Sequence, residues 1–174
     1  MVLLVTLPVW LSLLLSDHIF IGYPGQINEI PLFPKTASFS LLPNGSNPTL
    51  ENITATTLQI HDLQSKHGII PSLPTLLYVG THTANKGFDD LMTSAKTLKT
   101  PHNLVICGKV RDPSLPSIMR SLSAPSTNIV FTGFLHDGEL AILYHISDLL
   151  LFPSKSDTLP LSVIDAMACR TPVV

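Results

Sequence analysis

Two aspartates, Asp157 and Asp165, are the residues whose type and spacing most directly suggest chemistry. Their segment opens with the apolar run LLLF, continues through the polar loop SKSDT and ends in the helix-forming stretch LSVIDAMAC. One acid lies in the loop and the other on the predicted helix eight residues later, so both can face one crevice. Open α/β sheets bind ligands in such a crevice, at the carboxyl ends of their strands.

Ionised carboxylates in a crevice of this kind suit hydrogen bonding to the hydroxyls of a sugar or ribose. General acid–base catalysis would need a reacting group held between the two acids. The alternative is that Asp157 is an ordinary loop residue and Asp165 an exposed helical acid.

Lys86 is the next candidate, because it ends a polar loop just before a helix that begins near Phe88. A helix amino terminus carries free N–H groups and partial positive charge, and a neighbouring lysine can complete a phosphate site. On spacing alone, a solvated loop lysine is the favoured alternative. The loop is not a Walker A loop, because it lacks the second glycine and the Ser or Thr after the lysine.

The elements that must position these residues follow a regular pattern from Thr75 onward. Short apolar strands alternate with polar loops and amphipathic helices, which predicts an α/β fold with a doubly wound parallel sheet. The predicted strands are TLLYVG, NLVICG, NIVFTG and DLLLF, with TPVV as the start of another. Three of them end in Gly80, Gly108 and Gly133, and we expect their loops to share one edge of the sheet with Asp157.

Composition excludes several classes of protein. The chain is 45% hydrophobic and 13% charged, against about 25% charged in an ordinary soluble domain, which argues for a sizeable core and against disorder. A formal net charge of −2 and scattered basic residues predict no nucleic-acid partner and no polybasic membrane patch.

Cysteine and histidine give no sign of a metal site. Cys107 and Cys169 lie in apolar runs and are expected to be small buried hydrophobes. The seven histidines show no paired metal spacing, so each is expected to be a surface or locally hydrogen-bonded side chain.

The first 15 residues are apolar, but no Lys or Arg precedes Lys35 and Pro8 interrupts the run. A signal peptide or membrane anchor is therefore less favoured than a buried helix followed by the strand DHIFIGY.

Residues 76–174 resemble the carboxy-terminal, donor-binding domain of retaining glycosyltransferases with the GT-B fold, the "glycosyl transferases group 1" family. The segments that carry this resemblance are LLYVG…NKGFDDLM, NLVICG, NIVFTGFLHDGELAILYHISDLLLFPS and SDTLPLSVIDAMACRTPVV. Upstream, LLPNG resembles the family's interdomain segment, and SDHIFIGYPG resembles the last strand–helix step of its amino-terminal domain.

The resemblance implies a Rossmann-like half of a GT-B enzyme, incomplete at both ends. Residues 1–40 would be a remnant of the acceptor domain, 41–75 an interdomain connection, and 76–174 a truncated nucleotide-sugar-binding domain. The implied activity is transfer of a sugar from a nucleotide-sugar donor to an acceptor hydroxyl, with no metal or other cofactor. The acceptor is left open between a polysaccharide, a lipid-linked sugar and a small glycoside. A cytoplasmic location is expected, with peripheral membrane association as an alternative and without secretion.

The resemblance also assigns roles to residues. Asp157 would contact the transferred sugar as the catalytic carboxylate, Lys86 the diphosphate, Asp165 the ribose, and the loop after Gly133 the nucleobase through its backbone. The donor-binding positions are Gly80, Lys86, Gly133, Phe134, Leu135, Thr158, Leu159, Leu161 and Asp165.

Three positions depart from the family pattern. Thr81 replaces an arginine that would strengthen the phosphate clamp, and Asp165 replaces a glutamate. Arg170 replaces a glycine and is expected to disturb the turn after the last helix, unless the end of the chain leaves it free. Asp157 with Thr-Leu-Pro behind it resembles a subset of the family that carries Asp-Asn-Leu-Pro.

Two other functions remain as alternatives. The chain could be a non-catalytic truncated or split-gene fragment that acts at most as a nucleotide- or partner-binding module. Under the glycosyltransferase interpretation itself, we expect this chain to bind donor weakly and not to turn over alone. An epimerase or dehydrogenase is disfavoured, because no strand is followed by Gly-x-Gly-x-x-Gly.

Overall fold

The computed structural model describes residues 15–26, 38–110 and 112–174. It divides the chain into two compact units, Met1–Gly45 and Ser46–Val174. The predicted assignment of residues 1–40, 41–75 and 76–174 to parts of a two-domain enzyme stays a prediction. The structure adds that the segment from Ser46 onward packs with the second unit.

The first unit contains a two-stranded parallel sheet. Strand β1 (His18–Ile21) pairs with β2 (Ser38–Leu41) in the register that places His18 beside Ser38. Ile19 and Ile21 are its buried residues. The strand predicted in DHIFIGY is confirmed, whereas the helix predicted before it falls on residues 1–14, outside the described part of the chain.

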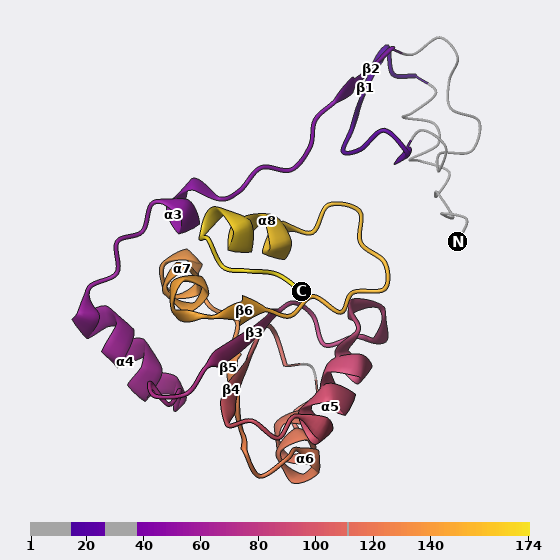
Figure 1. Cartoon of the computed structure of the whole chain (residues 1–174). Coiled ribbons are helices and arrows are strands. Elements are labelled where there is room, and N and C mark those ends of the chain that lie inside the picture. Colours follow the sequence, from indigo (N-terminus) through magenta and orange to yellow (C-terminus); the bar gives the residue numbers. More distant parts are fainter. Residues whose placement is uncertain (1–14, 27–37, 111) are drawn as a thin grey trace. The chain divides into compact units, whose positions relative to one another are not determined.

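The second unit is built on a four-stranded parallel sheet with the order β5-β4-β3-β6 (Figure 1). Its strands are β3 (Thr75–Val79), β4 (His102–Cys107), β5 (Thr127–Gly133) and β6 (Leu149–Leu150). Val173 bridges in parallel to Leu150, so TPVV extends the sheet beyond β6 as predicted. The α/β fold with a parallel sheet is confirmed.

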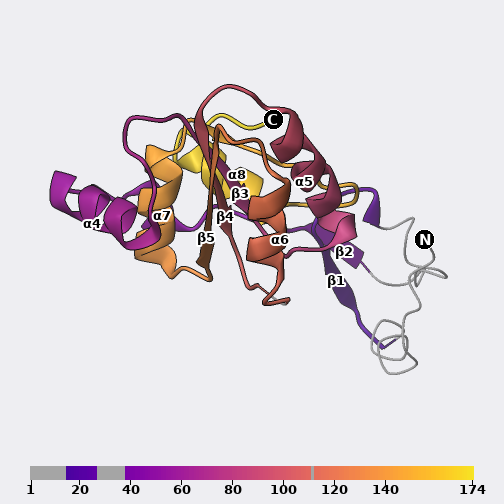
Figure 2. The same ribbon diagram turned by 90° about the horizontal axis from the view of Figure 1, so that it is seen from below.

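Helices cover both faces of this sheet (Figures 1 and 2). One face carries α5 (Phe88–Thr97) and α6 (Leu115–Leu122). The other carries α3 (Pro48–Glu51), α4 (Thr57–His67), α7 (Asp137–Ile146) and α8 (Leu161–Ala168). Because successive side chains of a strand point to opposite faces, Leu104 and Ile106 enter the first core, and Val105 and Cys107 the second.

Helix α4 shows how local sequence sets these boundaries. Thr56 and Gln59 form a capping box at its start, and Gly68 ends it in a left-handed conformation with φ 74°. Its Leu63 is buried in the core together with Leu50 of α3. The sequence predicts a helix over 51–66, and the structure has it as α4, which begins later, at Thr57. The short helix α3 precedes it.

A polar network is buried at the amino ends of the strands. Asn103 is fully buried, and its amide oxygen accepts from the backbone N–H of Ile70 at 3.0 Å. Its amide nitrogen donates to the carbonyls of Ile70 and Leu73 at 2.9 and 3.2 Å. One side chain therefore fixes the connection between α4 and β3.

Both cysteines, Cys107 and Cys169, are buried, as predicted. Within the described ranges, no helix is long and apolar enough to cross a membrane.

Helix α8 ends in a Schellman motif built without its usual glycine. The N–H of Thr171 donates to the carbonyl of Ala166 at 2.8 Å, and that of Arg170 to Met167 at 3.0 Å. Arg170 occupies the left-handed position with φ 63°. The disturbed turn expected from the sequence is not observed, because the arginine itself adopts the conformation that glycine would take.

We expect Arg170→Gly to raise the free energy of unfolding by about 1 kcal/mol, since the steric cost of a Cβ in the left-handed region exceeds the entropic cost of glycine. Urea denaturation of both proteins measures the difference. Arg170→Ala is the matched control, because it keeps the Cβ and should bring no such gain. A gain of equal size in the alanine variant would show that the long side chain, and not the backbone conformation, is the source of strain.

Candidate functional site

The direction in which successive strands are added to the sheet reverses between β3 and β6. The chain runs outward from β3 through β4 to β5 and then crosses back to place β6 on the other side of β3. In open α/β sheets this reversal opens a crevice beyond the carboxyl ends of the two central strands, where ligands bind. Two loops lie at this point: residues 80–87 after β3 and residues 151–160 after β6.

Three glycines line the carboxyl edge of the sheet beside these loops. The N–H of Gly80 donates to the carbonyl of Cys107, and the N–H of Gly108 to that of Gly133, each at 3.0 Å. A Cβ on Gly108 would lie 2.1 Å from the carbonyl oxygen of Gly80, so only glycine allows this approach. The three loops share one edge of the sheet, as predicted.

The loops after β3 and β6 are in direct contact. The short helix η1 (Ala84–Lys86) ends at Gly87, where φ is 68° and a Cβ would lie 1.9 Å from the carbonyl oxygen of Pro153. The N–H of Lys155 also donates to the carbonyl of Asn85 at 3.0 Å. Backbone contacts therefore fix the two loops against each other.

This contact brings together two of the predicted site residues. The ammonium of Lys86 donates to Oδ2 of Asp157 and forms an ion pair with it. Their side chains retain 35% and 19% of their exposure, so the pair is half-buried. Lys86 is therefore a partnered residue and not a freely solvated loop lysine. Oδ1 of Asp157 accepts from the N–H of Thr158 at 3.1 Å.

A second ion pair joins the same two parts of the chain at their rim. Lys155 contacts Oδ2 of Asp90, in the first turn of α5, at 3.0 Å, and both side chains are 57% exposed. Because exposed pairs contribute little, this pair serves below as a matched comparison for Lys86 and Asp157.

Asp165 has a different set of partners. Its Oδ1 accepts from the backbone N–H of Asn47 at 3.1 Å, and the Asn47 amide donates to Oδ2 of Asp137 at 3.0 Å. Burial raises the pKa of Asp165 and Asp137 raises it further, while the Asn47 hydrogen bond opposes both. The structure thus ties Asp165 to the start of α3. No local pattern predicts Asn47 as the partner of Asp165, because 118 positions separate the two residues.

In the loop after β5 some side chains are exposed to solvent and one is buried in the core. Phe134 is 73% exposed and meets His136 edge to face, with ring centroids 5.5 Å apart. Leu135 is buried in the core that α7 and α8 share. Gly133 precedes them with φ 72° and open space around its α-carbon. The backbone and the rings of Phe134 and His136 are exposed here.

The remaining predicted positions lie between β6 and α8. Thr158 is exposed, Leu159 is half-buried, and Leu161 begins α8 with 54% exposure. The structure records no direct interaction of Leu161 with Lys86 or Asp157, and its place in a binding site stays a prediction.

His82 is a residue that the sequence analysis placed wrongly. Its ring stacks on Phe88 with centroids 4.7 Å apart and meets the edge of Phe131 at 5.9 Å. Both ring nitrogens are buried without a hydrogen-bond partner among the described residues, and burial lowers the pKa of the imidazole. In the loop after β3, a half-buried neutral histidine therefore packs through its ring against two aromatic side chains. Neither spacing nor composition signals this.

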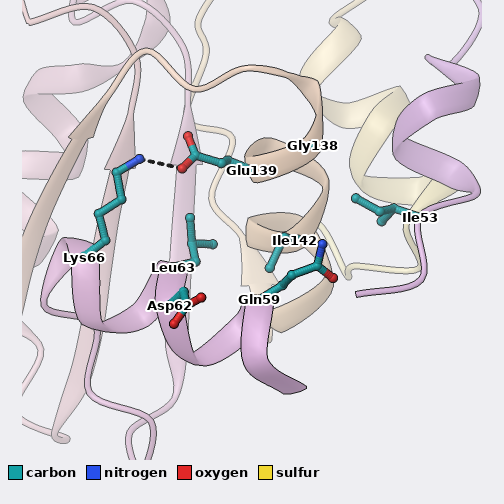
Figure 3. Close-up of a pocket in the computed structure, with 8 residues that line it drawn as sticks. All are labelled: Ile53, Gln59, Asp62, Leu63, Lys66, Gly138, Glu139 and Ile142. Carbon is teal, nitrogen blue, oxygen red and sulfur yellow. Dashed lines mark hydrogen bonds and ion pairs between the residues drawn. The ribbon is translucent and has the colours of Figure 1, made fainter. Parts of the chain in front are cut away.

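A hollow of about 340 Å³ between α4 and α7 is separate from these loops (Figure 3). Lys66 and Glu139 form an ion pair at 2.5 Å on one side of it, above the apolar side chains of Leu63 and Ile142. None of the predicted site residues lines it. The predicted site residues therefore lie elsewhere, and several of them lie at the carboxyl edge of the sheet.

Comparison with known families decides the identity of the fold. Residues 59–174 match the family model described as "Glycosyl transferases group 1". The chain belongs to this family. The chain is 30% identical over 135 residues to the "Uncharacterized glycosyltransferase MJ1607" of Methanocaldococcus jannaschii, covering 75% of this chain and 34% of that protein. It is also 33% identical over 75 residues to the "Serotype-specific mannosyltransferase WbdA" of Escherichia coli, covering 41% of this chain and 9% of that protein.

Solved structures share the fold of this group 1 chain. Sucrose-phosphate synthase from Thermosynechococcus elongatus superposes with a TM-score of 0.72 and 22% identity, over 95% of this chain and 42% of that protein. Anabaena Alr3699/HepE in complex with UDP-glucose superposes with a TM-score of 0.69 and 15% identity, over 91% and 44%. The chain thus spans less than half the length of each of these relatives.

Proposed function

We propose that this chain supplies the donor-binding half of a glycosyltransferase that moves a sugar from a nucleotide-sugar donor to an acceptor hydroxyl. The observation that carries the proposal is the position of the Lys86–Asp157 pair. A cation and a carboxylate meet at the point where the parallel sheet reverses its order, in a chain of the group 1 family.

Each of the two groups suits a different part of a nucleotide sugar. The Lys86 ammonium, beside the positive end of α5, suits the diphosphate, whose charge increases as it leaves the sugar. The Asp157 carboxylate suits the sugar hydroxyls, because an ionised carboxylate only accepts hydrogen bonds. The chain would thus hold the donor at both sides of the bond that breaks, and stabilise the leaving group.

Ligand complexes of a protein with this fold support a nucleotide sugar as the ligand. Alr3699/HepE, which shares this fold, was solved with UDP, with UDP and glucose, and with UDP-glucose. For this chain we propose that the exposed backbone after Gly133 borders the nucleobase and that Asp165 lies on the ribose side. The proposal involves no metal, and it leaves the base and the acceptor open.

We expect Lys86→Ala to weaken binding of a nucleoside diphosphate about tenfold, because it removes the cation that would contact the phosphates. Calorimetric titration of UDP, GDP and ADP into the 174-residue chain at low ionic strength measures the effect. Lys155→Ala is the control: it removes the same charge from the exposed rim pair and should change affinity less than threefold. Equal affinity in wild type and Lys86→Ala would exclude the phosphate role of Lys86.

A further inference from the structure

Lys86 and Asp157 are bonded to each other in the structure. Under the proposed function, the two groups act on different parts of the ligand. A nucleotide that lacks the sugar can replace only one half of this pair. We propose that Asp157 is a specificity-determining residue that favours the intact nucleotide sugar over the nucleoside diphosphate left after transfer, and it does so through its ion pair with Lys86. The inference rests on the proposed function and deepens it.

The first step concerns charge. In the structure the Lys86 ammonium neutralises the Asp157 carboxylate in a half-buried setting. A diphosphate that draws the ammonium to itself leaves the carboxylate without its cation and close to new negative charge. Like charges in partly desolvated surroundings repel more strongly than in water, so this arrangement lowers the affinity for the diphosphate.

The second step concerns what the sugar adds. A carboxylate has two oxygens with about four acceptor sites, and here one oxygen accepts from the N–H of Thr158. Hydroxyls of a bound sugar can donate to the remaining sites and so replace the lysine as the partner of Asp157. The intact donor compensates both groups, whereas the nucleoside diphosphate compensates Lys86 alone.

The third step concerns other cations nearby. In loop 80–87 Lys86 is the only lysine or arginine. Thr81 occupies the position at which the family pattern has an arginine. Loop 151–160 contributes Lys155, whose ammonium is already paired with Asp90 at the rim. The other lysine of these two loops, Lys155, is thus paired with Asp90 and not with Asp157.

The test compares two ligands on each protein: a nucleoside diphosphate and the matching nucleotide sugar, such as UDP with UDP-glucose, GDP with GDP-mannose, or ADP with ADP-glucose. In Asp157→Asn the repulsion is removed, so the diphosphate should bind about fivefold more tightly than to wild type. The nucleotide sugar should gain nothing or bind more weakly, because asparagine accepts fewer hydrogen bonds from the hydroxyls. The preference for the sugar-bearing ligand should therefore fall.

Asp90→Asn is the matched control. It removes the same charge from the neighbouring pair that joins the same two segments, and it should leave the preference unchanged. Thermal unfolding checks that each variant is folded, and Asp157→Ser serves the same comparison should the asparagine variant not fold.

The outcomes separate the inference from the proposed function. If the diphosphate binds wild type and both Asp157 variants equally, while Lys86→Ala still loses affinity, the discrimination is overturned and the donor site stands. If no nucleotide binds wild type or any variant, the proposed function and the inference fail together. Equal gains in Asp157→Asn and Asp90→Asn would overturn the inference by showing a general effect of net charge.

Discussion

Replacing Gly87 with alanine is expected to lower the free energy of unfolding by about 3 kcal/mol, because a left-handed residue must then also accommodate a backbone clash. The added Cβ would lie 1.9 Å from the carbonyl oxygen of Pro153 and 2.5 Å from its carbonyl carbon. Backbone atoms cannot move aside as the end of a flexible side chain can. The loops after β3 and β6 must separate, and Lys86 moves away from Asp157.

Two measurements test this result. Urea denaturation gives the loss of stability, and titration with a nucleoside diphosphate gives the loss of binding. Gly68→Ala is the matched control, because Gly68 has φ 74° and open space around its α-carbon. It should cost only the conformational penalty, about 1 kcal/mol. If the two alanine variants lose equal stability, the close approach to Pro153 contributes nothing to the loss in the free energy of unfolding.

Replacing Asn103 with alanine is the second large effect, with an expected loss of about 3 kcal/mol in the free energy of unfolding, because several buried polar groups lose their partners together. The amide of Asn103 has partners on the backbone of Ile70 and Leu73 and on the side chains of Thr75 and Asn128. Without it, the N–H of Ile70 loses its acceptor, and the link between α4 and β3 loosens.

The network lies at the amino ends of the strands, so its loss should affect stability and leave nucleotide affinity within about twofold, while the sheet itself remains folded. Denaturant unfolding and calorimetric titration of the same variant measure both quantities. Asn128→Ala is the comparison: its amide is half-buried and donates to Gly68 and Asn103, at 2.9 and 2.8 Å. It should lose about 1 kcal/mol. A loss below 1 kcal/mol in Asn103→Ala would show that water replaces the network.

Local pattern was enough to predict the sheet and the edge at which its loops meet. Short apolar runs ending in Gly80, Gly108 and Gly133 predict parallel strands whose loops meet, and the structure confirms it. Lys86 and Asp157 were expected on opposite sides of one crevice. Their direct bond was not predicted, because it depends on the close approach of Gly87 to Pro153, which no local pattern encodes.

Other features depend on contacts between distant residues. Asn47 reaches Asp165 across 118 positions, and His82 is half-buried because Phe88 and Phe131 pack against it. Neither set of contacts can be predicted from residue types and their spacing in the sequence. At Arg170 the sequence pattern indicates a position that usually holds glycine, which predicted a disturbed turn. In the structure the hydrogen bonds of the Schellman motif hold the arginine in the left-handed conformation.

The reversal of strand order between β3 and β6 also determines when the site can exist. Lys86 and Asp157 are 71 positions apart, and β4, α6, β5 and α7 all fold between them. Closing so long a loop is entropically costly, and it is repaid only when the central strands are paired. Nucleotide should therefore bind the finished sheet and not its partly folded forms. By mass action, a bound donor would then stabilise the whole unit and not the loops alone.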